Sequence, residues 1–347
     1  MKTKEFQEIF VSAFDDAPSW RNWFFSEVAV DESMIHLSRN QSGRAVGALL
    51  MQPYAFLYNG SDLPGEYMSC VATRPEARSH GVASHLIVEA LNEAYAHGTA
   101  ICSLVPAESH LFNFYRRFDF SDVFYVDRFR FAAGFRFKAP EYECICPGYE
   151  LFSRLERATG CCMLHSEKDF ANILADLRID GGSVIAVRSL DDSSQAILFA
   201  VKADGLLRVK CLMAENRYVA AAALSALCEK HKNTAMEVLA PAALDDRAFL
   251  KPYGMMRIVN VQPVLDALAS AHPDLKYALK VRDGLLPEND GIYSIRDGIC
   301  SRPAAFGGLL DLDIDIHTLT SLLFSSKKIA SITGLPSHRP YMTLMLD

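Results

Sequence analysis

A short run of residues near position 80 has the composition of an anion-binding turn. The run is Arg78-Ser79-His80-Gly81-Val82-Ala83, and apolar residues at helical spacing follow it as far as Tyr95. The first turn of a helix leaves backbone N–H groups without partners in the helix, and together with the helix dipole these groups attract anions. Gly81 has no Cβ, so the backbone there can approach a ligand closely, and Arg78 adds a positive charge. The run therefore predicts an anion-binding site, against the alternative that Gly81 only permits a turn.

A second chemically capable residue follows in the run Phe114-Tyr115-Arg116-Arg117-Phe118. Tyr115 carries a phenol, a polar group that can both donate and accept a hydrogen bond. Its neighbours at helical spacing, Leu111 and Phe118, are apolar. The alternative interpretation is therefore that Tyr115 is a buried aromatic residue of a helix.

Two predicted strands and a helix position these residues. Residues 67–73 are free of charge and end at Arg74-Pro75, and residues 99–105 form a second apolar run, so both are predicted to be buried strands. The apolar stripe between them predicts a helix that ends near Gly98. The predicted order is strand, tight loop, helix, strand, and then the helix that carries Tyr115.

The order and spacing of these residues resemble those of a known family. The pattern is Val-Ala-Thr-Arg-Pro-(x)2-Arg-x-x-Gly-x-Ala from Val71, followed by a helix, a strand and Phe-Tyr-Arg-Arg-Phe-x-Phe from Phe114. It is similar to the pattern of the GNAT superfamily of acetyl-CoA-dependent N-acetyltransferases. Relatives usually have glycine at position 119, where this chain has Asp119. Asp is among the few other residues that tolerate positive φ, so the fold is expected to survive this difference.

The resemblance implies roles for individual residues. The backbone of the first strand would bind the pantetheine arm of acetyl-CoA and polarise the acetyl carbonyl, at Val71, Ala72 and Thr73. The loop and the first turn of the helix would receive the diphosphate, at Arg78, Ser79, Gly81, Val82 and Ala83. Tyr115 would be the general acid. In the GNAT fold the first two helices border the pocket of the acceptor amine, so Trp20 and Trp23 are candidates for substrate binding, together with Cys70 on the strand.

Length and composition predict a cytoplasmic protein of several domains. The chain has 347 residues, half of them hydrophobic, which is enough for two or three domains. No apolar run approaches the roughly 20 residues of a membrane helix, and the first six residues lack the apolar core of a secretion signal. Nine cysteines without paired spacing predict a reducing compartment and no metal site. The net charge of -7 disfavours a nucleic-acid partner and mildly favours a cationic substrate such as an amine.

The remaining elements are predicted from periodicity and turn signals. Asn59-Gly60 predicts a hairpin turn. Before the motif, helices are expected at 5–13 and 20–28 and strands at 34–37 and 44–57. After the motif, strands are expected at 183–187, 196–201 and 206–211, and a helix at 217–230. This second set suggests a degenerate copy of the first half, and because it lacks Arg-x-x-Gly-x-Gly/Ala we assign it no cofactor site.

The end of the chain predicts a third, small domain. A strand running into a helix contains Arg257-Ile258-Val259-Asn260-Val261. Strands are then expected near 277–281, 291–295 and 310–314, a helix at 316–324 and a last strand at 341–346.

This layout resembles the enhanced-intracellular-survival (Eis) type of GNAT acetyltransferase, with an α+β fold throughout. The resemblance implies a catalytic GNAT domain that binds acetyl-CoA at 1–135, a degenerate GNAT-like domain at 136–268, and a sterol-carrier-like domain at 269–347. The last domain would deliver the C-terminus to the active site. By position, the terminal carboxylate of Asp347 would be the general base, against the alternative of a terminal strand without chemistry. His36, His80, His110 and Glu66 are weaker candidates for the base.

These features predict an N-acetyltransferase that uses acetyl-CoA as co-substrate, without a metal. The acceptor would be a small-molecule or peptide amine, such as a lysine side chain, an aminoglycoside or another polyamine. No nucleic-acid or membrane partner is expected, and the family implies a homo-oligomer. A non-catalytic acyl-CoA-binding sensor or scaffold is the alternative, and a lipid carrier built on the terminal domain is a third class.

Overall fold

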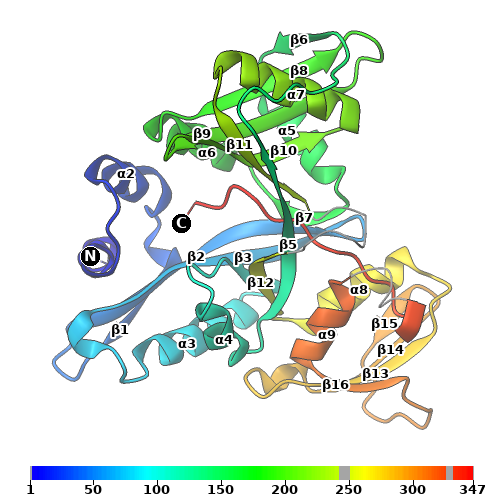
Figure 1. Cartoon of the computed structure of the whole chain (residues 1–347). Coiled ribbons are helices and arrows are strands. Elements are labelled where there is room, and N and C mark those ends of the chain that lie inside the picture. The colour runs from blue at the N-terminus through cyan, green and yellow to red at the C-terminus, as the bar shows by residue number, and fades with distance from the viewer. Residues whose placement is uncertain (1, 242–250, 326–330, 347) are drawn as a thin grey trace. The chain divides into compact units, whose positions relative to one another are not determined.

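The computed structural model describes residues 2–241, 251–325 and 331–346. These residues form two compact units, whose elements are labelled in Figure 1. One unit comprises residues up to Phe124 together with Tyr253–Pro340, and the other comprises Tyr125–Pro252 together with Tyr341–Leu346. Helices and strands occur in both units, which confirms the α+β class predicted from the sequence.

The first unit begins with the segment that carries the predicted site. Its elements in chain order are α1 (Lys2–Ala13), α2 (Pro18–Trp23), a π-helical turn (Phe24–Val28), a 3-10 turn (Glu32–Met34), β1 (Ile35–Arg39), β2 (Ala45–Tyr58), β3 (Ser61–Thr73), α3 (Val82–Ala96), β4 (Ile101–Leu104), α4 (Leu111–Arg116) and the start of β5 (Ser121–Phe131). With β12 (Lys251–Ile258), the strands form a sheet in the order β1-β2-β3-β4-β12. β3 and β4 run parallel, whereas β1/β2, β2/β3 and β4/β12 run antiparallel.

Asn59 and Gly60 close the long β2–β3 hairpin, as the sequence predicted. Both residues have positive φ, 50° and 79°, which a two-residue type I′ turn requires. Tyr58 pairs with Ser61 across the turn. The turn thereby sets the register of β3, which runs on to Thr73 beside the predicted site.

The apolar stripe of α3 packs into the core of this unit. Leu86, Ile87 and Leu91 belong to one buried cluster with Met68 of β3. Each such side chain stabilises the fold by about 1.5–3 kcal/mol when it leaves water. α3 ends at Ala96, and the predicted C-terminal glycine, Gly98, has φ 82°. The stripe therefore fixes which face of α3 meets the sheet.

The same unit contains a four-stranded sheet with two helices. Its elements are α8 (Val261–Ala271), β13 (Tyr277–Arg282), a 3-10 turn (Pro287–Asn289), β14 (Gly291–Arg296), β15 (Ile299–Ser301), β16 (Leu312–Asp315) and α9 (Ile316–Leu323). The strand order is β15-β14-β13-β16, and β13 and β16 are parallel. The strands and the helix predicted between residues 277 and 324 are present, within a few residues of the predicted bounds.

The second unit repeats the order of the first half of the chain. Its elements are the end of β5, β6 (Tyr142–Ile145), α5 (Tyr149–Arg157), β7 (Cys161–Leu164), α6 (Glu167–Ile179), β8 (Ser183–Ser189), β9 (Gln195–Ala203), β10 (Leu206–Ala214), α7 (Arg217–Lys230) and β11 (Ala235–Pro241). An antiparallel hairpin β9–β10, the helix α7 and a strand parallel to β10 follow one another. The hairpin β2–β3, the helix α3 and the parallel strand β4 have the same order.

The two equivalent helices differ at their N-termini. The Asn216 side chain caps α7 and accepts hydrogen bonds from the amides of Tyr218 and Val219, at 2.9 and 3.0 Å. α3 begins after Gly81, which has no side chain to do this. The first amides of α7 are therefore bonded to a side chain, whereas the first amides of α3 have no side-chain cap.

The predicted last strand at 341–346 is wrong. Tyr341 forms an isolated bridge with Cys162 and no strand follows. Leu344 has φ 54°, a left-handed conformation that interrupts an extended strand. The six residues Tyr341–Leu346 are nevertheless at most 9% exposed. Asp347 lies outside the described residues.

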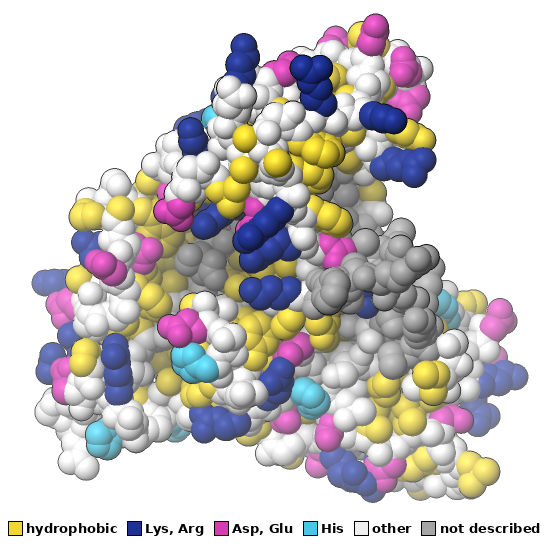
Figure 2. All heavy atoms as spheres, in the orientation of Figure 1, with side chains coloured by type: hydrophobic (Ala, Val, Ile, Leu, Met, Phe, Trp, Pro, Cys, Tyr) yellow, Lys and Arg dark blue, Asp and Glu magenta, His cyan; other side chains and the backbone are white. Residues whose placement is uncertain are grey.

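Within the described residues, no helix is long and apolar enough to cross a membrane. On the face drawn in Figure 2, Lys and Arg side chains are interspersed with Asp and Glu.

Candidate active site

Two residues with positive φ shape the loop between β3 and α3. After the 3-10 turn Pro75–Ala77, Ser79 has φ 65° and Gly81 has φ 76°. A Cβ at Gly81 would meet no atom within 4 Å, so the backbone angle and not a lack of space calls for glycine there. Serine is less tolerant of this conformation, and a residue held in it costs of order 1–3 kcal/mol. The loop therefore holds strain at the point where α3 begins.

The first turn of α3 presents its amides without partners from the helix itself. The first intrahelical hydrogen bond runs from the His85 amide to the Gly81 carbonyl, at 3.0 Å. The amides before it lack an intrahelical acceptor, as at the start of any helix. Gly81 provides no side-chain cap, and the first turn contains no acidic residue. The positive end of the helix dipole is therefore not neutralised within the helix.

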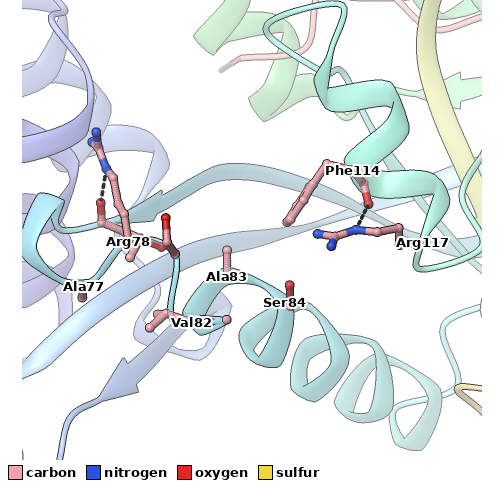
Figure 3. Close-up of a pocket in the computed structure, with 10 residues that line it drawn as sticks. Ala77, Arg78, Val82, Ala83, Ser84, Phe114 and Arg117 are labelled. Atoms are coloured by element: carbon pink, nitrogen blue, oxygen red, sulfur yellow. Dashed lines mark hydrogen bonds between the residues drawn. The ribbon is translucent and has the colours of Figure 1, made fainter.

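A cavity of about 360 Å³ opens at this helix start. It is lined by Thr73, Ala77, Arg78, Ser79, Gly81, Val82, Ala83, Ser84, Phe114 and Arg117. Figure 3 shows Phe114 of α4 and Arg117, the residue after α4, on one side and the first turn of α3 on the other. Two of the lining residues are cationic and none is acidic, so the cavity favours an anion.

The two arginines of the cavity are held differently. Arg78 donates from Nε to the Thr73 carbonyl at 3.2 Å, which turns its side chain back toward the end of β3 (Figure 3). The Arg117 guanidinium lies 4.7 Å from the centre of the Phe114 ring. Sequence reasoning selected Arg78 but missed Phe114 and Arg117, because their place on the wall depends on where α4 packs. In the structure Arg116 donates to Asp122, whereas Arg117 lines the cavity. The sequence Arg116-Arg117 does not indicate which arginine takes which place.

Close packing fixes the start of α3 against the sheet. A Cβ added to Gly47 of β2 would lie 2.5 Å from Cγ1 of Val82, the first residue of α3. Glycine is therefore required at position 47 for this approach. The close approach to β2 thus sets the position of Val82, which lines the cavity.

β3 contains a bulge just before the cavity. Leu50 pairs with Ser69 and Ala48 pairs with Ala72, so two residues of β3 oppose the single residue Leu49. Cys70, one of the two, has φ 53°. A bulge leaves backbone groups outside the ladder and redirects the strand, which is common beside active sites. The sequence does not reveal this bulge, because cysteine carries no preference for positive φ.

Among the described residues, β3 also has no paired strand on its β4 side along its last residues. Its parallel pairing with β4 ends at Tyr67 and Ser103, whereas β3 continues to Thr73. On the other side, Ala72 and Thr73 still pair with β2. The backbone predicted to bind a pantetheine arm, Val71–Thr73, therefore lies in the stretch beyond the β3–β4 ladder.

Tyr115 lies in the core and not on the wall of the cavity. It is 8% exposed and belongs to the buried cluster that includes Leu86 and Phe118. Burial raises the pKa of its phenol well above the usual value, and the thiols of Cys102 and Cys70 add to the shift. The phenol is consequently protonated at neutral pH, as a proton donor must be.

Position 119 has the conformation that the sequence suggested. Asp119 has φ 60° and follows Arg117 and Phe118, the two residues after the helix that carries Tyr115. Its carboxylate accepts a hydrogen bond from Arg257 Nη1 at 2.9 Å. Aspartate therefore supplies both the backbone angle and an additional charged contact.

The predicted acceptor-pocket residues pack in different ways. Trp20 is 9% exposed and stacks on Phe24 with ring centres 4.8 Å apart. Trp23 is half-buried and meets Trp20 edge-on at 6.2 Å. Cys70 is buried in the bulge. None of the three lines the cavity described above.

The alternative bases lie off the cavity wall. His36 lies 3.5 Å from Glu93, and burial lowers its pKa. Glu66 accepts a hydrogen bond from Thr99 at 2.8 Å, and burial raises its pKa. His80 and His110 are exposed: the first contacts the Arg78 carbonyl and the second Glu108. Among these four residues, Glu66 is the one that lies on β3, the strand that leads to the cavity.

The arrangement fits a doubly charged anion such as a diphosphate. Uncapped amides, two cations and a wall without carboxylates complement a doubly charged group. The cavity volume is within the usual range of small-ligand sites, about 300–1,000 Å³. The stretch of β3 beyond its ladder with β4 ends at Thr73, which lines the cavity.

Two protein-family models match the chain. An acetyltransferase (GNAT) domain model matches residues 2–123. The chain contains a GNAT acetyltransferase domain. A sterol carrier protein domain model matches residues 257–335, which include the four-stranded sheet.

Solved structures share the fold over nearly the whole chain. A conserved protein of Enterococcus faecalis V583, described as a "probable N-acyltransferase", has a TM-score of 0.76 at 19% identity, covering 96% of this chain and 91% of that chain. A GCN5-related N-acetyltransferase from Anabaena variabilis has a TM-score of 0.71 at 16% identity, covering 98% and 95%. Eis1 from Mycobacterium abscessus has a TM-score of 0.70 at 14% identity, covering 96% and 90%. Among curated proteins, none matches the sequence.

The protein is therefore an acyltransferase with a GNAT domain, a second GNAT-like region and a sterol-carrier-like domain. The predicted fold class is confirmed. The boundaries at 135 and 268 and the roles of individual site residues stay predictions.

We predict that Tyr115 remains protonated when ordinary tyrosines ionise. In the folded protein, the tyrosinate absorbance of the parent minus that of Tyr115→Phe should stay flat through about pH 10 and rise only above it. In denaturant the same difference should appear near pH 10. Because the folded pKa exceeds the unfolded one, stability from this phenol is present below about pH 10 and declines as the pH rises further. A difference already present near pH 10 in the folded protein would contradict the burial of the phenol.

Proposed function

We propose that the protein is an acetyl-CoA-dependent N-acetyltransferase of the Eis type, which transfers an acetyl group directly to a primary amine. The observation that carries this proposal is the uncapped start of α3 facing a cavity with two arginines and no carboxylate. The GNAT domain, the second GNAT-like region and the sterol-carrier-like domain support the Eis type, as does the similar fold of Eis1. The acceptor is proposed to be a lysine side chain, an aminoglycoside or another polyamine.

The residues of the cavity would hold the co-substrate by its charge. Arg78, Arg117 and the amides of the first turn of α3 would bind the diphosphate. The backbone at Val71–Thr73 would align the pantetheine arm. Acetyl-CoA, when bound, supplies the thioester carbon that the amine attacks. Together with the bulge at Cys70, these groups orient the reacting carbonyl.

Two proton transfers complete the reaction. An alkylamine has a pKa near 10.4, so it is mostly protonated at neutral pH and must lose a proton to become a nucleophile. The terminal carboxylate of Asp347 is the proposed base, and Glu66 is the alternative. The Tyr115 hydroxyl is the proposed donor to the departing sulfur, since burial keeps it protonated.

The proposal includes an arrangement of three domains, at 1–135, 136–268 and 269–347, with the last residues directed to the active site. The burial of all six residues before Asp347 supports a docked end. The Tyr341 amide donates to the Cys161 carbonyl at 2.9 Å, and Thr343 Oγ1 donates to the Lys210 carbonyl at 3.2 Å. A cytoplasmic homo-oligomer is part of the proposal by resemblance.

A second function, acyl-CoA binding without transfer, is favoured by one observation. Tyr115 is 8% exposed and does not line the cavity. A protein that only binds the cofactor would need the uncapped start of α3 and its cavity, but no accessible phenol. Turnover distinguishes the two functions.

We predict release of free CoA thiol when acetyl-CoA is mixed with a panel of amines. Tyr115→Phe should lower kcat about 10²–10⁴-fold, the usual contribution of a general acid, while calorimetry shows unchanged CoA binding. The matched control is Tyr218→Phe, which removes an exposed phenol from α7. An unchanged kcat in Tyr115→Phe removes this residue from the mechanism. CoA binding without thiol release for any amine supports the non-catalytic function.

Extending the chain by one glycine after Asp347 should slow the enzyme. The extension displaces the terminal carboxylate while the buried residues before it stay in place, so kcat should fall about 10²–10⁴-fold with CoA affinity unchanged. The control carries the same glycine at the N-terminus. Full activity of the C-terminally extended protein excludes the terminal carboxylate as the base and leaves Glu66.

A further inference from the structure

An arginine is buried completely in β12. Arg257 is 0% exposed, and its Nη2 donates to both carboxylate oxygens of Asp283 at 2.6 and 2.8 Å. The Asp283 side chain is also 0% exposed. Removing two charges from water is costly unless their remaining hydrogen bonds are satisfied. Because burying this ion pair is costly, the pair depends on the other contacts of Arg257.

The other end of Arg257 holds the residues that follow α4. Nη1 donates to the Phe118 carbonyl and to Asp119 Oδ2, both at 2.9 Å. The Phe118 amide in turn donates to the Tyr115 carbonyl at 2.9 Å. One guanidinium is thus two hydrogen bonds away from the backbone of the proposed proton donor.

α4 depends on such contacts for its position. It has six residues and no side-chain N-cap, and helices this short are not stable by themselves. The segment after it makes a second contact of the same kind: Ser121 Oγ donates to the His317 carbonyl at 2.9 Å. His317 belongs to α9, so both contacts join this segment to the sterol-carrier-like domain.

Asp283 is itself held rigidly in that domain. Its Oδ1 accepts from the amides of Leu285 and Leu286, at 3.1 and 3.0 Å, and its Oδ2 accepts from Asn289 Nδ2 at 2.9 Å. Asn289 also bonds the Val259 carbonyl and the Val261 amide. Asp283 is therefore held in place by its own hydrogen bonds, and through Arg257 it can hold the residues that follow α4.

We propose that Arg257 is a positioning residue for the transfer reaction. By bonding Asp283 on one side and Phe118 and Asp119 on the other, it fixes the C-terminal end of α4 and so the phenol of Tyr115. The sterol-carrier-like domain then contributes to the geometry of catalysis through this arginine, in addition to any role of the chain's end. The inference rests on the proposed function, since it assumes that Tyr115 donates the proton.

Asp119 is the place to test this connection. Its side chain is 31% exposed, so changing it leaves the core intact. Asp119→Gly keeps a residue suited to positive φ and removes the acceptor, whereas Asp119→Asn keeps both the angle and a neutral acceptor. The matched control is Asp313→Asn, which removes a carboxylate from an exposed pair with Arg282.

In Asp119→Gly, kcat should fall about 10- to 100-fold, the effect of a misplaced catalytic group, while KM for acetyl-CoA stays within about twofold. The fall in kcat should be smaller in Asp119→Asn, and kcat should be unchanged in Asp313→Asn. In a Tyr115→Phe background, Asp119→Gly should cause no further loss, because both changes act on the same proton transfer. An unchanged kcat in Asp119→Gly, or a loss that persists fully in the Tyr115→Phe background, overturns the proposal.

A spectroscopic measurement separates this proposal from the proposed function. With ring-labelled tyrosine, the NMR signal that disappears in Tyr115→Phe belongs to Tyr115. It should shift in Asp119→Gly and stay in place in Asp313→Asn. If the parent releases no thiol with any amine, the proposed function fails, and the Tyr115 signal alone then decides: a shift supports positioning by Arg257, and an unmoved signal overturns it.

Discussion

The site depends on backbone amides that a helix cannot satisfy by itself. Every helix begins with such groups, but the surroundings decide what they bind. At α7 the Asn216 side chain occupies two of them. At α3 the glycine before the helix has no side chain, and the first turn contains no acidic residue. Val82 packs closely against Gly47, so the helix start lies close to the sheet. An anion is the partner that these constraints leave.

Two elements next to the start of α3 carry the other groups of the candidate site. β3 carries the bulge at Cys70 and the backbone beyond its ladder with β4. α4 places Tyr115 in the core, and Arg117, the residue that follows α4, lines the cavity. The short α4 has no side-chain N-cap, and the buried Arg257 holds the segment after it by a hydrogen bond to the Phe118 carbonyl. A domain matched to sterol carrier proteins thereby becomes part of the frame of the acyltransferase.

Local signals predicted much of this arrangement, and tertiary packing determined the rest. Asn59-Gly60 and the stripe of α3 carry their own turn chemistry and periodicity, and both were predicted correctly. α6 was not predicted, although Ser166 and Asp169 form the capping box that marks its start. The bulge at Cys70, the left-handed Leu344 and the place of Arg117 have no local signal. The junction around Arg257 resembled a family pattern, but its partners Asp119 and Asp283 are distant in sequence and visible only in the fold.

The central claim is that the start of α3 binds the diphosphate of CoA. Calorimetric titration with CoA, dephospho-CoA and pantetheine tests it most directly, because the first two contain the diphosphate and the third does not. Charge-assisted hydrogen bonds contribute about 1.5–3 kcal/mol each, so losing two should weaken binding by roughly 10²-fold or more. We expect CoA and dephospho-CoA to bind with similar affinity and pantetheine to bind at least that much more weakly. Equal affinity for pantetheine and CoA would contradict the account.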